Sequence, residues 1–122
     1  MFDYLAEGIK KFVPEACEEG PPMPLGVTFS FPIDQTSLTT GTLNRWTKGF
    51  SADGVVGKDV CKLLNEALAR KGVKRVHVAA LINDTTGTLA SGGAGNPSCY
   101  IGLILVRQAF FHSTQCNPSF LA

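Results

Sequence analysis

The spacing of hydrophobic residues predicts two amphipathic helices and a half-buried strand. Residues 2–13 carry apolar side chains at helical intervals, and residues 58–71 place an apolar stripe along one helix face. Gly72 follows the second segment as a natural helix C-terminal cap. In residues 25–31, valine and phenylalanine alternate with threonine and serine, which is typical of a strand with one buried face, and Pro32 is expected to end it.

Other segments extend this pattern. Residues 76–82 and 100–106 are almost wholly apolar, so each is expected to be a strand buried on both faces. Residues 40–50 are a further candidate for extended structure. The polar segment that begins at Asn83 is expected to open a short helix, with Asp84 at or near its N-cap. Strand, helix and strand with short connections indicate an α/β fold.

Length and composition limit the classes of function. A chain of 122 residues corresponds to one domain or a piece of a larger one, and 44% hydrophobic against 17% charged residues argues against disorder. The net charge of +1 gives no overall attraction to nucleic acid or to an anionic membrane. No apolar run approaches the length of a membrane span, and charges interrupt the N-terminal apolar residues, so no signal peptide is expected.

The cysteines and histidines do not form a metal-binding pattern. The four cysteines contain no Cys-x-x-Cys pair, and neither histidine neighbours a cysteine, so no metal site is predicted. Cys61 and Cys99 lie in apolar surroundings and are expected to be small buried hydrophobes. A reduced, cytoplasmic setting is the simplest expectation for such a chain.

Two adjacent polar residues follow the apolar segment 76–82. Asn83 and Asp84 would lie at the carboxyl end of a strand, where α/β sheets bind their ligands. Carboxamide and carboxylate groups together can bind neighbouring hydroxyls, because one donates hydrogen bonds and both accept them. The alternative is that Asp84 only caps the helix that follows, and position alone leaves both interpretations open.

A second set of polar residues lies among aromatic ones. Ser30 is expected on the strand face opposite the phenylalanines, and Thr47 and Lys48 follow a tryptophan at a glycine turn. Hydroxyl and ammonium groups suit a neutral polyol, whereas a phosphate would need more glycine and more positive charge. The alternative is that both hydroxyls only satisfy backbone groups. Thr47 and Lys48 can both face a ligand only where the chain has turned.

The glycine-rich segment 91–96, "SGGAGN", looks like a phosphate-binding loop. It lacks the Lys-Ser/Thr pair of a P-loop, and its glycines follow a helix-like segment instead of opening one. We therefore expect a plain turn there.

Six motifs together resemble the eukaryotic hexokinase family. They are "LGVTFSFP", "QTSL", "RWTKGF", "VGKDV", "LINDTTGTL" and "IGLI", which occur in the family's order and spacing between about Phe2 and Leu105. The resemblance implies a partial actin-like ATPase (ribonuclease H-like) α/β fold, with a mixed sheet and flanking helices. It also implies that residues 2–84 belong to the small lobe, that 85–106 begin the large lobe, and that 107–122 are a tail foreign to the family.

The resemblance also implies a reaction. Hexokinases use ATP and Mg²⁺ to phosphorylate the 6-hydroxyl of glucose or a related hexose, a reaction of glycolysis in the cytoplasm. The positions that match the family's sugar contacts are Ser30, Thr47, Lys48, Asn83 and Asp84. Asp84 also matches the catalytic base. Many relatives carry a sugar-binding Asn directly before the motif's tryptophan, but Arg45 stands there in this chain, so that contact is not carried over.

The departures from the family leave three interpretations of the chain open. The family's Asp-x-Gly-Gly-Thr phosphate loop would lie upstream of Met1, and "LVRQAFFHSTQC" stands where a Gly-Thr-Gly turn would follow "IGLI". The chain is therefore expected to lack most of the elements that hold ATP, and the isolated 122 residues are not expected to be active. Hexokinase catalysis, non-catalytic sugar binding, and a truncated product without function are the three alternatives.

Overall fold

The computed structural model describes residues 1–13 and 20–105. The tail predicted at 107–122 lies outside the described residues. Helices and strands follow in the order α1 (Phe2–Phe12), β1 (Met23–Thr28), β2 (Ile33–Ser37), β3 (Thr40–Leu43), α2 (Val60–Arg70), β4 (Val76–Ile82) and α3 (Asp84–Gly95).

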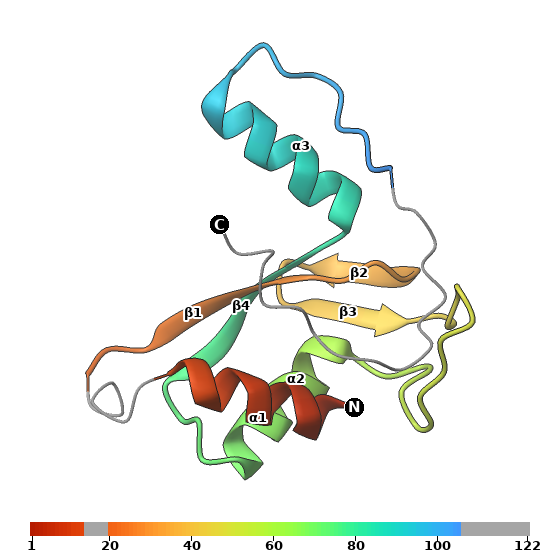
Figure 1. Ribbon diagram of the computed structural model, residues 1–122. Coiled ribbons are helices and arrows are strands. Elements are labelled where there is room, and N and C mark those ends of the chain that lie inside the picture. The colour runs from red at the N-terminus through yellow and green to blue at the C-terminus, as the bar shows by residue number, and fades with distance from the viewer. Residues whose placement is uncertain (14–19, 106–122) are drawn as a thin grey trace.

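The parallel pair of β1 and β4 lies at the centre of the fold (Figure 1). Met23 pairs with Val76 at one end and Thr28 with Ile82 at the other, with one shift of register after Leu25. The Phe29 N–H donates to the Ile82 carbonyl at 2.9 Å, which continues the pairing one residue beyond β1. Because the strands are parallel, the chain leaves both of them at the same edge.

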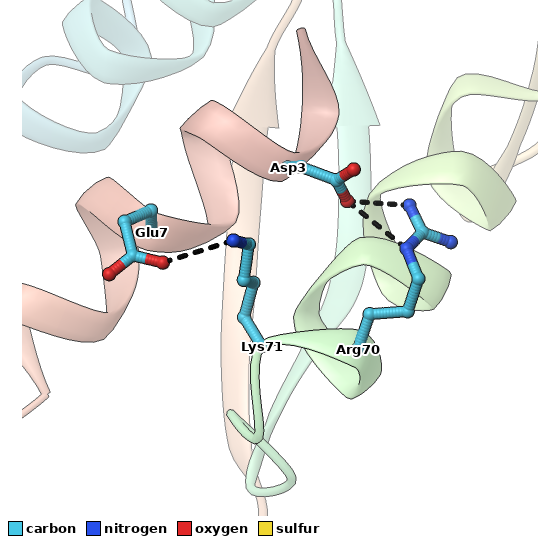
Figure 2. Close-up of polar contacts among 4 residues, drawn as sticks. All are labelled: Asp3, Glu7, Arg70 and Lys71. Atoms are coloured by element: carbon cyan, nitrogen blue, oxygen red, sulfur yellow. Dashed lines mark hydrogen bonds and ion pairs between the residues drawn. The ribbon is translucent and has the colours of Figure 1, made fainter.

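Helices α1 and α2 lie side by side at the end of the molecule opposite α3 (Figure 1). Their apolar stripes and the strands form the core, in which Leu43, Leu68 and Leu81 are the largest fully buried side chains. On the surface, Asp3 of α1 pairs with Arg70 of α2 at 2.7 Å, and Glu7 pairs with Lys71 at 3.3 Å (Figure 2). Exposed pairs add little stability, so apolar burial carries most of this packing.

The antiparallel hairpin of β2 and β3 is tied to β4 through Leu81. The Leu81 N–H donates to the Leu38 carbonyl at 2.7 Å, and the Gln35 side chain donates to the Leu81 carbonyl at 2.6 Å. Gly41 lies so close to Leu81 that a Cβ at this position would be 2.5 Å from the leucine Cδ2 atom. The hairpin therefore fixes β4 only three residues before Asp84.

Several predicted elements are confirmed. The helices expected at 2–13 and 58–71 are α1 and α2, and the strand expected at 76–82 is β4. The mixed α/β class with flanking helices is also confirmed.

The boundaries of the first strand were predicted wrongly. It runs from Met23 to Thr28, with the pairing continued only by the Phe29 N–H, and the rings of Phe29 and Phe31 pack against each other and against Trp46. In the expected extended segment 40–50, only Thr40–Leu43 is a strand. Burial of β4 on both faces was also wrong, because His77 is exposed and several neighbours are only half-buried.

The glycine-rich and C-terminal predictions were wrong as well. The turn expected at 91–96 is the last part of α3, which continues to Gly95. Residues 100–105 form no strand, and four of their apolar side chains are 72–88% exposed: Tyr100, Ile101, Leu103 and Leu105. The segment instead runs back along α3, where Gly102 lies against Leu89 and a half-buried Cys99 lies against Gly92. Glycine at both contacts permits this close approach.

Candidate functional site

The predicted site residues gather where the chain leaves β1 and β4. Ser30 lies two residues beyond the end of β1, and Asn83 and Asp84 directly follow β4. Parallel pairing brings these segments to one edge, as the sequence predicted for the carboxyl ends of strands in an α/β sheet. Helix α3 begins at this edge with Asp84 as its first residue.

Asn83, and not Asp84, occupies the N-cap position of α3. The Asn83 Oδ1 atom accepts the Thr85 N–H at 3.0 Å, and Asp84 Oδ1 accepts the same N–H at 2.9 Å. The helix therefore has a cap without Asp84, which weakens the interpretation that Asp84 serves only as a cap. Within the described residues the Asn83 Nδ2 group makes no hydrogen bond, so it is available as a donor.

The surroundings of Asp84 favour its ionised form. The Ser30 hydroxyl is the main cause, because as a hydrogen-bond donor it lowers the pKa of the Asp84 carboxyl below the ordinary 3.8. Slight burial opposes this effect, while the Thr85 N–H and the positive charge of Lys48 add to it. The carboxylate is thus charged at neutral pH and partly open to solvent.

A tight turn presents Lys48. The Phe50 N–H donates to the Thr47 carbonyl at 3.1 Å, and the two residues between them have positive φ angles, 60° for Lys48 and 70° for Gly49. A lysine in the left-handed region is uncommon, whereas glycine adopts it readily. The strand has already ended at Leu43. The condition under which Thr47 and Lys48 could face one ligand, that the chain has turned, is therefore met.

Four rings, which we call the aromatic cluster, pack against one another: Phe29, Phe31, Trp46 and Phe50. The first two flank Ser30 in the sequence, and the last two flank the turn that carries Lys48. The sequence interpretation set the phenylalanines apart from Ser30 but missed their contact with Trp46. The signal was present in "FSF" and "WTKGF", where small polar residues are interleaved with rings.

The predicted site residues differ in how directly they interact with Asp84. Ser30, Lys48 and Asn83 lie next to it or act on its charge, whereas the half-buried Thr47 side chain shows no hydrogen bond within the described part of the chain. Among the same residues, no group of three His, Cys, Asp or Glu side chains could hold a metal ion. The glycine-rich segment 91–96 is mostly helical and offers no open phosphate loop. The described residues therefore form neither a cluster of metal-binding side chains nor an open glycine-rich loop for phosphates.

Comparison with known proteins decides the family. A family model described as hexokinase matches residues 1–94. The chain belongs to the hexokinase family. It is 49% identical over 110 residues to Hexokinase-1 of Arabidopsis thaliana, covering 86% of this chain and 22% of that one. It is 51% identical over 126 residues to Hexokinase-2 of Solanum tuberosum, covering 97% and 25%.

The fold agrees with solved hexokinases. A hexokinase from Schistosoma mansoni, complexed with glucose, has a TM-score of 0.73 and 46% identity over 80% of this chain and 22% of that one. The chain thus spans a quarter or less of the length of these relatives. The actin-like ATPase class expected from the hexokinase resemblance is confirmed for this part of the fold. None of the helices in 1–13 and 20–105 is long and apolar enough to cross a membrane.

Proposed function

We propose that this hexokinase chain forms the sugar-binding edge of an active site that phosphorylates the 6-hydroxyl of glucose or a related hexose. The observation that carries the proposal is that the pairing of β1 with β4 brings Ser30 to the strand ends where Asn83 and Asp84 lie. The charge of Lys48 also acts on the Asp84 carboxylate. We also propose that residues 2–84 belong to the small lobe and that 85–106 begin the large lobe. The cytoplasm, where glycolysis takes place, is the proposed location.

The polar groups at the edge suit a hexose. A carboxylate has about four acceptor positions. The Asp84 carboxylate accepts the Thr85 N–H, and the Ser30 hydroxyl lowers its pKa. The remaining positions can accept sugar hydroxyls, while the Asn83 amide and the Lys48 ammonium can donate to sugar oxygens. Thr47 is the fifth proposed contact, and its hydroxyl would need to turn toward the sugar.

Asp84 is proposed as the general base. A sugar hydroxyl becomes an effective nucleophile as its proton is accepted, and a fixed carboxylate beside it can take that proton. With a pKa no higher than the ordinary 3.8, the Asp84 carboxylate carries no proton at neutral pH and can therefore accept one. The family implies ATP as the phosphoryl donor and Mg²⁺ as its metal ion. The described residues form no open phosphate loop, so we assign them no contact with the phosphates.

Non-catalytic sugar binding is the second candidate. It is favoured because the described residues offer candidate sugar contacts but neither a cluster of metal-binding side chains nor an open phosphate loop. Both candidates share the sugar site, and they differ in whether this chain transfers phosphate.

Two measurements test the proposal, the first of them on the 122-residue chain. Glucose added during an NMR titration should shift the backbone amide signals of Asn83, Asp84 and Thr85 until they saturate, and Asp84→Ala should remove the effect. A chain that shows no saturable shift would contradict the sugar site. A coupled assay for glucose 6-phosphate with ATP and Mg²⁺ then separates the candidates once residues 1–94 replace the matching segment of a full-length relative, because formation of the product that is lost in Asp84→Ala would exclude the non-catalytic one.

A further inference from the structure

Trp46 links the two segments that supply Ser30 and Lys48. The centroid of its ring lies 4.9 Å from that of Phe31, with the two ring planes at 90°, and 4.8 Å from that of Phe50, with the planes at 65°. It also lies 6.3 Å from Phe29. These separations are within the range of favourable ring contacts. Trp46 therefore contacts both rings that flank Ser30 and the ring that closes the Lys48 turn.

The indole of Trp46 also closes its own loop. The Nε1–H donates to the Ala52 carbonyl at 2.9 Å, so the loop from 46 to 52 is held at both ends. The tip of this loop is exposed at Lys48 and Gly49, and Phe50 is 44% exposed. Lys48 keeps a left-handed backbone there, which persists only where surrounding contacts impose it.

We propose that Trp46 is a positioning residue of the sugar site, which holds the segments of Ser30 and Lys48 near Asp84 before any ligand binds. The ring fixes the segment of Ser30 through Phe29 and Phe31. It fixes the turn of Lys48 through Phe50 and the Ala52 carbonyl. The catalytic meaning of this arrangement rests on the proposed role of Asp84, but the arrangement itself can be tested without sugar.

The ionisation of Asp84 reports on this arrangement. Its pKa is held down first by the Ser30 hydroxyl and, more weakly, by the charge of Lys48. Freeing both segments should therefore let the pKa of Asp84 rise toward its ordinary value of 3.8. A loss of stability elsewhere in the fold should leave it unchanged.

The experiment follows the side-chain carboxyl carbon of Asp84 by NMR during an acid titration of the 122-residue chain. Trp46→Leu should raise the pKa of Asp84 toward 3.8, and Trp46→Phe, which keeps a ring but loses the bond to Ala52, should give a smaller rise. Leu68→Val, which disturbs a fully buried position in α2, should lower the Tm without moving this pKa.

A folded Trp46→Leu chain with the wild-type pKa at Asp84 would overturn the proposal. If that variant does not fold, Trp46→Phe decides in the same way, because an unchanged pKa would show that the indole does not hold the site. An equal rise in Leu68→Val would also overturn it, since any destabilisation would then have the same effect. No sugar or ATP is present, so a failed glucose titration would count against the proposed function and not against this positioning role.

Discussion

Replacing Gly41 by alanine should destabilise the fold at the contact between the hairpin and β4. The new Cβ would lie 2.5 Å from Leu81 Cδ2 and 3.1 Å from Ile33 Cδ1. Leu81 is only 1% exposed, so its side chain cannot turn away into solvent. Forcing one extra carbon into a packed core typically costs about 1–3 kcal/mol.

Gly26→Ala is the matched control, because no atom lies within 4 Å of its Cβ position in β1. Neither glycine has a positive φ angle. Both substitutions reduce the freedom of the unfolded chain alike, a gain of about 0.4–1 kcal/mol. The difference between the two variants therefore isolates the packing cost at Leu81, about 1–3 kcal/mol.

Urea unfolding of the wild type and both variants measures this difference, provided that the slope of the free energy with urea stays the same. Gly41→Ala should unfold at a lower urea concentration than Gly26→Ala. If the two variants were equally stable, or if Gly41→Ala were the more stable, Leu81 would have room to move, and the hairpin would not hold β4 as described.

Three further predictions concern other parts of the fold. Asp59→Ala should cost about 0.5–2 kcal/mol in thermal unfolding, because Asp59 Oδ1 accepts the first N–H groups of α2, and an unchanged Tm would contradict this. Burial raises the pKa of the Cys61 thiol to about 11, so peptide mapping after alkylation at pH 8 should find Cys61 unmodified while half-buried Cys99 reacts; equal labelling would contradict its burial. Arg70 lowers the pKa of Asp3 below 3.8, so the pair stabilises the fold above pH 3.8 and this stabilisation is lost as the pH falls through the folded pKa of Asp3. Asp3→Asn should remove the contribution of the pair to the dependence of Tm on acid pH, and a Tm profile equal to that of the wild type would contradict the prediction.

Sequence pattern predicted the elements that have a clear apolar face. Helices α1 and α2 and strand β4 carry repeated apolar residues, and their positions follow from the pattern. Strand β2 was missed because only Ile33 in it is even half-buried, so it shows no alternation. Its position depends on pairing with β3 and on the Gln35 bond to Leu81, which join residues far apart in the chain.

Glycine misled the prediction at α3. "SGGAGN" was expected to be a plain turn after a helix-like segment, and glycine does lower helix stability by about 1 kcal/mol relative to alanine. In the structure the helix continues, and Gly92 leaves room for Cys99 of the returning segment. Such a contact between segments cannot be read from local propensity.

The sequence indicated which residues could form the candidate site but not how they are arranged. The resemblance and the strand ends pointed to Ser30, Asn83 and Asp84. The N-cap role of Asn83 and the left-handed backbone of Lys48 are local details that required the structure. The linking role proposed for Trp46 depends on ring contacts between separate loops, for which no sequence pattern exists.

The central claim is that Asp84 accepts the proton of the sugar hydroxyl, and the turnover of Asp84→Asn tests it most directly. Residues 1–94 can replace the matching segment of a full-length relative such as Hexokinase-2 of Solanum tuberosum, and kcat and Tm are then measured with glucose, ATP and Mg²⁺. Loss of a general base costs about 10²–10⁴-fold, so kcat should fall by that factor. The Tm should hardly change, because Asn83 caps α3 and asparagine is itself a good residue near a helix start. Asp53→Asn, an exposed carboxylate in the loop before α2, is the control and should keep the kcat of the parent. An Asp84→Asn enzyme within a few-fold of the parent kcat would contradict the assignment of Asp84 as the base.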